Sequence, residues 1–474
     1  MTDHTVITRF APSPSGALHA GNLRTALFSL LLARHSKGKF VLRIEDSDSA
    51  RLDRAAIDGI QADLRWLGLH WDEGPGEGVD PIHWRQSARS AVYARAAQTL
   101  LAQGDAYWCF CTAERLAALR SEQQAAGKPP RYDGCCRDLS SSEANQRHEH
   151  GESAVLRLRM PTSGTLAFDD LIRGPQSTAA EALGDPILQR ADGSPAFLFA
   201  NALDDAAMGV SHVLRGEDHL SNTPRQQVLL ARLGYSAPAY GHVSLVVDAD
   251  GAPLSKRSGA AGIASLREAG YRPEALVNYL ARLGNPLAEE SLLDLDGLAA
   301  VFDVGRLSRS PARFDFAQLD HWQSQAMAAL PPTTLLSYLQ FSGVPENQRL
   351  ALAELVQPNL QRADEIEAWA VRLFDPGLIA IADEKPLQKA GAAFFEQVDS
   401  VLNDSGDADW SVLRPLLEST TGQRGGAMMK PLRLALTGLA YGPALGEVIR
   451  LMPPAIRQAR LQRAIAIAAA GDSA

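Results

Sequence analysis

Residues 6–46 read VITRFAPSPSGALHAGNLRTALFSLLLARHSKGKFVLRIED, and this stretch decides the fold. It predicts a strand, a loop rich in Pro, Ser and Gly, an amphipathic helix, and a second strand from Lys39 to Ile44. Leucines recur along the helix at helical spacing (Leu23, Leu27, Leu30 and Leu31). A strand–helix–strand unit of this kind is typical of a parallel sheet in which the helix is the crossover.

The pattern changes on the C-terminal side of this unit. A helix is expected over residues 57–67, and residues 76–193 then lack a regular period and contain all four cysteines. Near Pro195 a strand signal returns in FLFANALDD and continues in VSHVLRGEDHL and YGHVSLVVD, with a helix PRQQVLLARLG between them. We therefore expect a parallel sheet that is interrupted by an insertion, completed afterwards, and followed from about residue 261 by mainly helical chain.

Length and composition limit the class of protein. The 474 residues predict roughly three structural units, and 46% hydrophobic and 21% charged residues are typical of a globular protein. No run reaches 18 apolar residues and the N-terminus has no signal-peptide pattern, so we expect a cytoplasmic protein with no membrane partner. The net charge of −9 argues against non-specific coating of nucleic acid. From Arg414 onward, however, the sequence contains eight basic and three acidic residues, which suits either local RNA contact or a solvated helix surface.

Two loops carry the chemistry. His19 lies in a Pro/Ser/Gly loop just before the first helix, where unpaired N–H groups and the helix dipole can hold phosphates. A second loop, LSKR at residues 254–257, places two adjacent cations on small-residue chain. The chain lacks GxxxxGK[ST] and GxGxxG, so it is not predicted to be a P-loop or dinucleotide-binding protein. Taken singly, each loop also has a purely structural interpretation.

Together these loops resemble the signatures of class I aminoacyl-tRNA synthetases. The similarity narrows to bacterial glutamyl-tRNA synthetases through five segments: RFAPSPSGALHAGNLRTAL, LRIEDSDSAR, LRWLGLHWDEGP, MGVSHVLRGEDHLSNTPRQ and LSKRSGA. SPARFDFAQLDHW and KPLRLALTGLAYGP resemble the C-terminal half of the same family. The resemblance spans nearly the whole chain.

The resemblance implies an α/β Rossmann-type catalytic core with an α+β insertion, followed by an all-α anticodon-binding domain. The implied boundaries are residues 1–75 and 194–253 for the two halves of the core and 76–193 for an acceptor-stem-binding insertion. Residues 254–320 are expected to hold the LSKR loop and a stem-contact region, and residues 321–474 the anticodon-binding helices.

The implied activity joins L-glutamate to tRNA-Glu through a glutamyl-adenylate made from ATP, with Mg²⁺ neutralising phosphate charge. The catalytic residues implied are His19 and Lys256, and tRNA is expected to bind before activation. The residues implied to contact ATP are Pro12, Ser13, Pro14, Ser15, Gly16, His19, Gly21, Asn22, Leu254, Ser255, Lys256 and Arg257.

For glutamate, the resemblance implies Arg9, Ala11, Ser13, Glu45, Phe197, Asn201 and Arg215. The two arginines are expected to hold the substrate's carboxylate, which suits guanidinium geometry, and Glu45 to accept its α-amino group. The family has tyrosine where this chain has Phe197, so one hydroxyl is missing from the implied pocket. Without the resemblance, surface pairing with Arg43 or Arg51 is the favoured interpretation of Glu45.

The cysteines lie in one short window, which suits a metal site better than a disulfide framework. By the resemblance, Cys109, Cys111, Tyr132 and Cys136 form a structural zinc site, and zinc favours four such ligands. Other relatives place a histidine where this chain has Asp138, and Cys135 is an additional candidate. Reduced thiols in a site that has lost its metal are the alternative.

Other functions remain to be weighed against this one. A glutaminyl-tRNA synthetase carries C-terminal β-barrels, and relatives that glutamylate a tRNA base lack the anticodon domain, so the helical C-terminal region favours neither. A catalytically altered paralogue that acts as an RNA-binding module is the alternative from a different class. The sequence leaves open whether tRNA-Gln is also charged, and family precedent implies a monomer.

Overall fold

The computed structural model describes residues 5–14, 16–47, 54–76, 78–254, 262–377, 379–406 and 408–471. The chain divides into two compact units. The first consists of Met1–Ala269 with Pro273–Gln318, and the second of Gly270–Arg272 with Leu319–Ala474.

Parallel strands form the centre of the first unit. Strand β1 (Ile7–Phe10) pairs in parallel with β2 (Lys39–Leu42), and α1 (Ala20–His35) connects them. The turn into β2 needs Gly38, because a Cβ there would lie 1.9 Å from the carbonyl oxygen of Val6. A second parallel pair, β8 (His212–Gly216) with β9 (Ala239–Val243), lies beside β1, since the Ser211 N–H donates to the Ile7 carbonyl at 2.9 Å. The predicted strand–helix–strand unit is confirmed.

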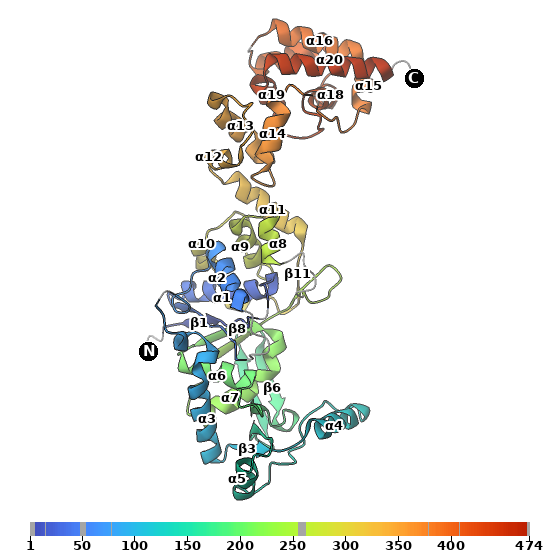
Figure 1. Cartoon of the computed structure of the whole chain (residues 1–474). Coiled ribbons are helices and arrows are strands. Elements are labelled where there is room, and N and C mark those ends of the chain that lie inside the picture. Colours follow the sequence, from blue (N-terminus) through green and yellow to red (C-terminus); the bar gives the residue numbers. More distant parts are fainter. Residues whose placement is uncertain are drawn as a thin grey trace. The chain divides into compact units, whose positions relative to one another are not determined.

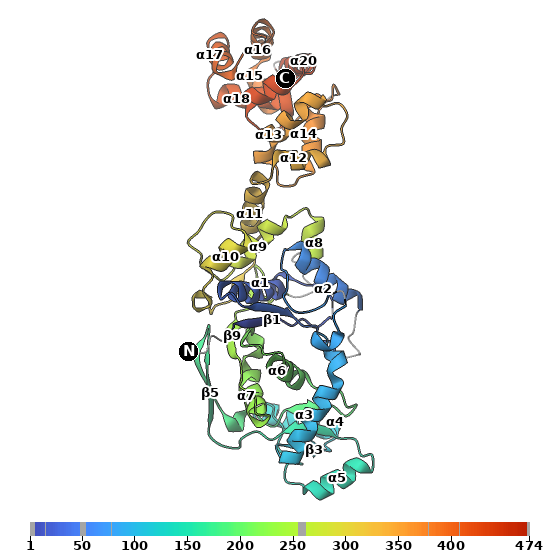
Figure 2. The ribbon, with the colours of Figure 1, turned by 90° about the vertical axis from the view of Figure 1, so that its left-hand side faces the viewer.

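Helices cover both sides of these strands. In Figures 1 and 2, α1 lies on one side of β1 and α6 (Phe197–Ala207) on the other. The expected strand FLFANALDD is therefore wrong, because this segment is α6. Its buried apolar residues surround the helix on most sides, which hides the helical period that a half-exposed helix would show. The other two helices of the core, α2 (Arg54–Trp66) and α7 (Thr223–Arg232), are where the sequence predicts them.

The insertion is a small α+β structure. Its antiparallel sheet has the order β3-β4-β7, and a separate hairpin pairs β5 with β6. The helices and strands of the insertion are α3 (Ser90–Gln103), β3 (Ala106–Cys109), α4 (Ala113–Ala125), α5 (Ser141–Glu149), β4 (Val155–Leu158), β5 (Thr165–Asp170), β6 (Gly174–Ala179) and β7 (Ile187–Gln189). The hairpin reaches back to the core strands, because the Leu171 N–H donates to the Tyr240 carbonyl at 2.8 Å.

The first unit ends in short helices and one further parallel pair. Strand β10 (Val246–Val247) pairs with β11 (Ala312–Arg313). Between these strands lie α8 (Ile263–Glu268), α9 (Pro273–Arg282) and α10 (Leu295–Val301).

The second unit contains helices joined by loops, and no strand occurs among its described residues. Its helices are α11 (Phe316–Ala328, which begins in the first unit), α12 (Pro332–Leu335), α13 (Arg349–Val356), α14 (Glu365–Phe374), α15 (Lys385–Ala390), α16 (Ala392–Asp404), α17 (Trp410–Thr421), α18 (Gly426–Thr437), α19 (Leu445–Leu451) and α20 (Pro454–Gly471). Prolines start α12 and α20, as expected of a residue that has no N–H to pair. Helices α16 and α20 lie side by side (Figure 1) around a core that includes Phe395 and Leu461. No helix in the described parts of either unit is long and apolar enough to cross a membrane.

Candidate active site

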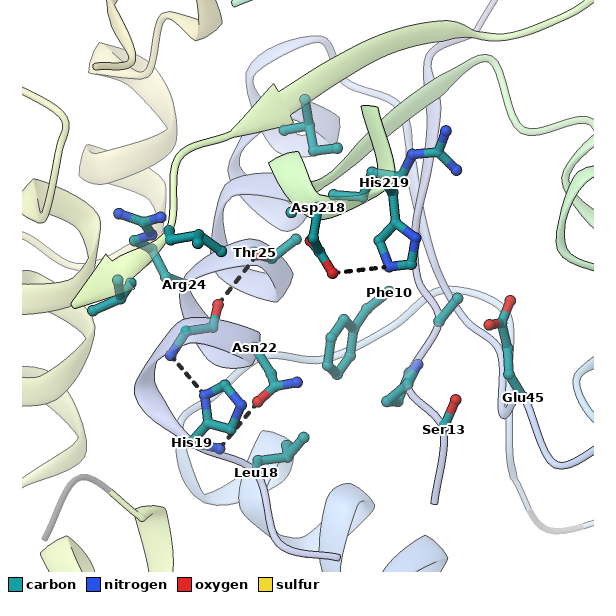
Figure 3. A pocket seen from close by; sticks show the side chains of 18 of the residues that line it. Phe10, Ser13, Leu18, His19, Asn22, Arg24, Thr25, Glu45, Asp218 and His219 are labelled. Carbon is teal, nitrogen blue, oxygen red and sulfur yellow. Dashed lines mark hydrogen bonds and ion pairs between the residues drawn. The ribbon is translucent and has the colours of Figure 1, made fainter. Parts of the chain in front are cut away.

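A pocket of about 380 Å³ opens at the carboxyl ends of β1 and β8. The pocket reaches the N-terminal ends of α1 and α6. The backbone N–H groups at a helix start and the polar side chains of the pocket can therefore contact the same ligand. Ligands of open parallel sheets bind at this edge. Figure 3 shows His19 and Asn22 on one side of the pocket and Glu45 and Ser13 on another.

His19 begins α1 as its N-cap residue. The ring Nδ1 of His19 accepts the backbone N–H of Gly21 at 3.2 Å, and the backbone N–H of His19 donates to the Asn22 side-chain oxygen at 3.3 Å (Figure 3). A neutral His19 ring therefore carries its proton on Nε2. Gly21 permits this cap, because a Cβ there would lie only 3.1 Å from the ring. The arrangement fixes the imidazole at the positive end of a helix, where phosphates bind.

Most of the loop residues predicted to contact ATP line this pocket. Those that do are Pro12, Ser13, Gly16, His19, Gly21, Asn22 and Leu254. Pro14 is buried but is not part of the lining. Ser15, Ser255, Lys256 and Arg257 lie outside the described residues.

Two buried arginines from the core strands face the pocket. Arg9 on β1 donates from Nε to Asp205 at 3.1 Å and from Nη1 to the Leu214 carbonyl at 3.0 Å. Arg215 on β8 is 5% exposed and, within the described residues, no carboxylate lies within ion-pair distance of it and its Nη1 is buried with no hydrogen-bond partner. Burial lowers the pKa of Arg215 to about 10. A buried cation with an unused donor is the strongest indication that this pocket takes an anion.

Glu45 follows β2 and lies inside the pocket wall. Its Oε1 accepts hydrogen bonds from the Asn201 amide at 2.7 Å and from Arg43 at 3.0 Å. Pairing with Arg43 is therefore real, but it is buried rather than on the surface. Burial raises the pKa of Glu45, and Arg43 and Asn201 offset only part of this effect. A ligand cation beside Glu45 would favour its charged form.

Asp205 on α6 pairs with Arg9, which faces the pocket, and with Arg43, which pairs with Glu45. Its Oδ1 lies 3.1 Å from Nε of Arg9 and 2.7 Å from Nη1 of Arg43. Burial alone would raise the pKa of Asp205, but the charges of Arg43 and Arg9 lower it by more. Sequence reasoning missed this residue, because nothing in the FLFANALDD pattern shows that its last carboxylate points inward.

The remaining glutamate candidates, Ala11, Ser13 and Phe197, also line the pocket. Phe197 stacks on His219, with ring centroids 5.1 Å apart. His219 and Asp218, which lie 3.6 Å apart through Nε2 and Oδ2, also line the pocket (Figure 3). Neither was predicted, although both follow Arg215 in the RGEDH segment, and their position next to that arginine was the available signal.

The cysteine window forms a compact cluster in the insertion. The sulfurs of Cys109, Cys111 and Cys136 all lie within 4.8 Å of one another. The Tyr132 hydroxyl lies 3.3 Å from the Cys109 sulfur and 3.6 Å from the Cys111 sulfur. Cys135 and Asp138, in contrast, are exposed and outside the cluster.

The surroundings favour a thiolate at Cys109, whereas burial raises the pKa of Cys111 to about 12. Burial raises the pKa of the Cys109 thiol, but hydrogen bonds from Tyr132, the Cys111 backbone and Arg157 lower it by more. Arg115 also donates to the Cys111 sulfur at 3.4 Å. Three convergent thiols and a phenol form a donor set that fits a tetrahedral zinc ion.

The family comparisons agree with this geometry. The family model described as tRNA synthetases class I (E and Q), catalytic domain, matches residues 5–321. A second model, described as an anticodon binding domain, matches residues 326–465. The class of protein is therefore a class I tRNA synthetase with a helical anticodon-binding domain, and the predicted fold class is confirmed.

Relatives match along the whole chain. Glutamate--tRNA ligase 2 of Alkalilimnicola ehrlichii is 48% identical over 99% of this chain and 99% of its own. The protein of the same name from Nitrosococcus oceani is 48% identical over 97% of this chain and 98% of its own. A crystal structure of a glutamate tRNA ligase from Elizabethkingia meningosepticum, in complex with its amino acid, has a TM-score of 0.85 at 29% identity and covers 98% of this chain and 99% of that one. The chain thus belongs to the bacterial glutamate--tRNA ligase family, as its motifs implied.

Proposed function

We propose that this protein is a glutamate--tRNA ligase that makes glutamyl-adenylate from L-glutamate and ATP and then esterifies the 3′ end of tRNA-Glu. The observation that carries the proposal is Arg215, a buried guanidinium with an unused donor at Nη1, in a pocket that also contains a helix N-terminus. One wall can bind an anionic amino acid while the other binds phosphates.

The amino acid is held between opposite charges. Arg215 and Arg9 bind a carboxylate of glutamate, and Glu45, which Asn201 and Arg43 orient, accepts its α-ammonium group. Ala11, Ser13 and Phe197 complete the pocket wall. Phe197 lacks the hydroxyl of the family's tyrosine, and its ring stacks on His219 in the pocket wall.

The first chemical step forms a bond between an oxygen of the glutamate α-carboxylate and the α-phosphorus of ATP, and breaks the bond from that phosphorus to pyrophosphate. His19 at the start of α1 and Lys256 stabilise the negative charge on the phosphate oxygens during this step. Mg²⁺ accompanies the ATP and neutralises its phosphates. The other ATP contacts are those of the two loops, residues 12–22 and 254–257. In the second step a 3′-terminal hydroxyl of the tRNA attacks the carbonyl carbon, and AMP leaves.

The domains divide the contacts with tRNA. Residues 76–193 are assigned to the acceptor stem, residues 254–320 to the LSKR loop and adjoining stem, and residues 321–474 to the anticodon. The match of residues 326–465 to an anticodon-binding family supports the last assignment. The protein is further proposed to act in the cytoplasm as a monomer and to bind tRNA before activation.

A structural zinc ion is proposed in the insertion, held by Cys109, Cys111, Tyr132 and Cys136. The close grouping of the three sulfurs and the phenol oxygen supports it. When bound, the ion would fix the fold of the insertion, since its four positions are taken by protein ligands.

The test is aminoacylation with radiolabelled glutamate, using tRNA-Glu and tRNA-Gln transcripts separately. Charging of tRNA-Glu that depends on ATP supports the proposal, and charging of tRNA-Gln as well identifies a non-discriminating enzyme. A folded protein that charges neither would favour the catalytically altered paralogue, which the full-length relatives do not favour.

A further inference from the structure

A series of hydrogen bonds between buried side chains connects Arg215 to the insertion. The Nε of Arg215 donates to Nε2 of His242 on β9 at 3.1 Å, and its Nη2 donates to the Thr223 hydroxyl at 2.7 Å. Nδ1 of His242 in turn lies 2.5 Å from Oδ2 of Asp170, the last residue of β5. His242 and Thr223 are fully buried, and Asp170 is 4% exposed.

Only one protonation pattern satisfies this series of hydrogen bonds. A guanidinium can only donate, so Nε2 of His242 must be the unprotonated nitrogen. The proton of a neutral ring then lies on Nδ1, where the Asp170 carboxylate accepts it. Burial lowers the pKa of His242, and the charge of Arg215 adds to this effect, while the hydrogen bond to Asp170 opposes it. The ring is accordingly neutral and has a defined direction.

Asp170 is itself held so that only one of its oxygens faces His242. Its Oδ1 accepts the backbone N–H groups of Ile172 at 2.9 Å and Arg173 at 2.8 Å, which form the turn of the β5–β6 hairpin. The same oxygen also accepts the backbone N–H of His242 at 3.3 Å. These bonds leave Oδ2 to accept the proton of the His242 ring.

We propose that Asp170 and His242 are positioning residues for glutamate binding: they fix the guanidinium of Arg215 so that its unused Nη1 points into the substrate pocket. The inference rests on the proposed function, because it needs glutamate to bind Arg215. It adds a contribution of the inserted β5–β6 hairpin to the amino-acid site. The hairpin does not touch the substrate, and it acts by setting the tautomer of one histidine.

The substitution Asp170→Asn keeps the shape of the side chain but reverses the direction of its hydrogen bond with the His242 ring. The three backbone N–H groups keep the amide oxygen at the Oδ1 position, so the NH₂ group replaces Oδ2 and donates toward Nδ1. His242 must then move its proton to Nε2, where it opposes the Nε–H of Arg215 and can no longer accept from the Thr223 hydroxyl, 3.1 Å away. We expect the KM for glutamate in tRNA-Glu charging to rise about tenfold, the effect of one misdirected hydrogen bond, with the KM for ATP unchanged.

A matched control is Asp185→Asn, another buried carboxylate of the insertion. Asp185 accepts hydrogen bonds from the Tyr107 hydroxyl at 2.6 Å, the Met160 N–H at 2.8 Å and Arg137 at 2.6 Å, and no contact with Arg215 is present among the described residues. Its variant should leave the KM for glutamate unchanged. An equal rise in both variants, or no rise in Asp170→Asn, would overturn the positioning role.

A second measurement needs no active variant. Long-range ¹⁵N–¹H spectra of histidine-labelled wild-type protein should show the Nδ1–H tautomer for His242, identified by the signal lost in His242→Gln. A proton on Nε2, or on both nitrogens, would contradict the inference even if Asp170→Asn does not fold. Failure of the wild-type protein to charge tRNA would instead contradict the proposed function, and the tautomer result would still stand by itself.

Discussion

Replacement of Arg215 by methionine should separate glutamate binding from stability. Burial lowers the pKa of Arg215 from 12.5 to about 10, which corresponds to a destabilisation of about 3 kcal/mol at neutral pH. Methionine removes this buried charge together with the two hydrogen bonds that Arg215 donates to the Thr223 hydroxyl and the His242 ring, at about 1 kcal/mol each; these two partners lie 3.1 Å apart and can still bond to each other. The free energy of unfolding should therefore stay the same or rise by about 1 kcal/mol.

Glutamate binding should respond in the opposite direction. Loss of a hydrogen bond to a charged group costs about 1.5–3 kcal/mol, which lowers kcat/KM for glutamate by about 10- to 150-fold. The assay is steady-state charging of tRNA-Glu with glutamate varied at saturating ATP, together with a thermal melt of both proteins. A melting temperature that falls by many degrees in the variant would refute the claim that the buried charge of Arg215 destabilises the free protein. An unchanged kcat/KM would refute its contact with glutamate.

Three further predictions concern Asp205, the two loops that bind ATP, and the cysteine cluster. Asp205→Asn leaves the buried Arg9 without its carboxylate partner and removes one of the carboxylates around Arg43, which keeps Glu45, and it should destabilise the first unit by about 3–5 kcal/mol in a urea titration. Because the pKa of Asp205 is lowered by folding, its contribution is complete above its unfolded value of 3.8 and lost as pH falls below that value, so wild type and variant should converge in strong acid. His19→Ala and Lys256→Ala should each slow adenylate formation in a rapid-quench assay while the circular dichroism spectrum is kept, and normal rates in both would remove them from the chemical step. Metal analysis should find one zinc per chain in wild type and in the control Cys135→Ser, but less in Cys136→Ser; equal zinc in the two variants would exclude the proposed ligand set.

The sequence was most informative where function constrains the local pattern. The parallel unit around α1 and the helical second unit follow from periodicity, and the helix start at His19 follows from the small-residue loop before it. The cysteine window predicted a compact cluster, and the family resemblance named the three sulfurs that meet, while Cys135 was left open as a further candidate.

The failures have two physical causes: one helix is buried on most sides, and some contacts join residues that are far apart in the sequence. Helix α6 was predicted as a strand because a fully buried helix has no polar face to show its period. The partners of the pocket arginines were missed for a related reason. Asp205 is 196 residues from Arg9, and Asp170 reaches Arg215 only through His242, so these contacts depend on the tertiary fold.

The activity itself is tested by charging purified tRNA-Glu with radiolabelled glutamate, using the wild-type protein. A glutamate--tRNA ligase should give acid-precipitable label that requires ATP and is reduced at least tenfold, by the loss of a charged hydrogen bond, in Arg215→Met. A folded wild-type protein that transfers no glutamate to tRNA-Glu would contradict the proposed activity.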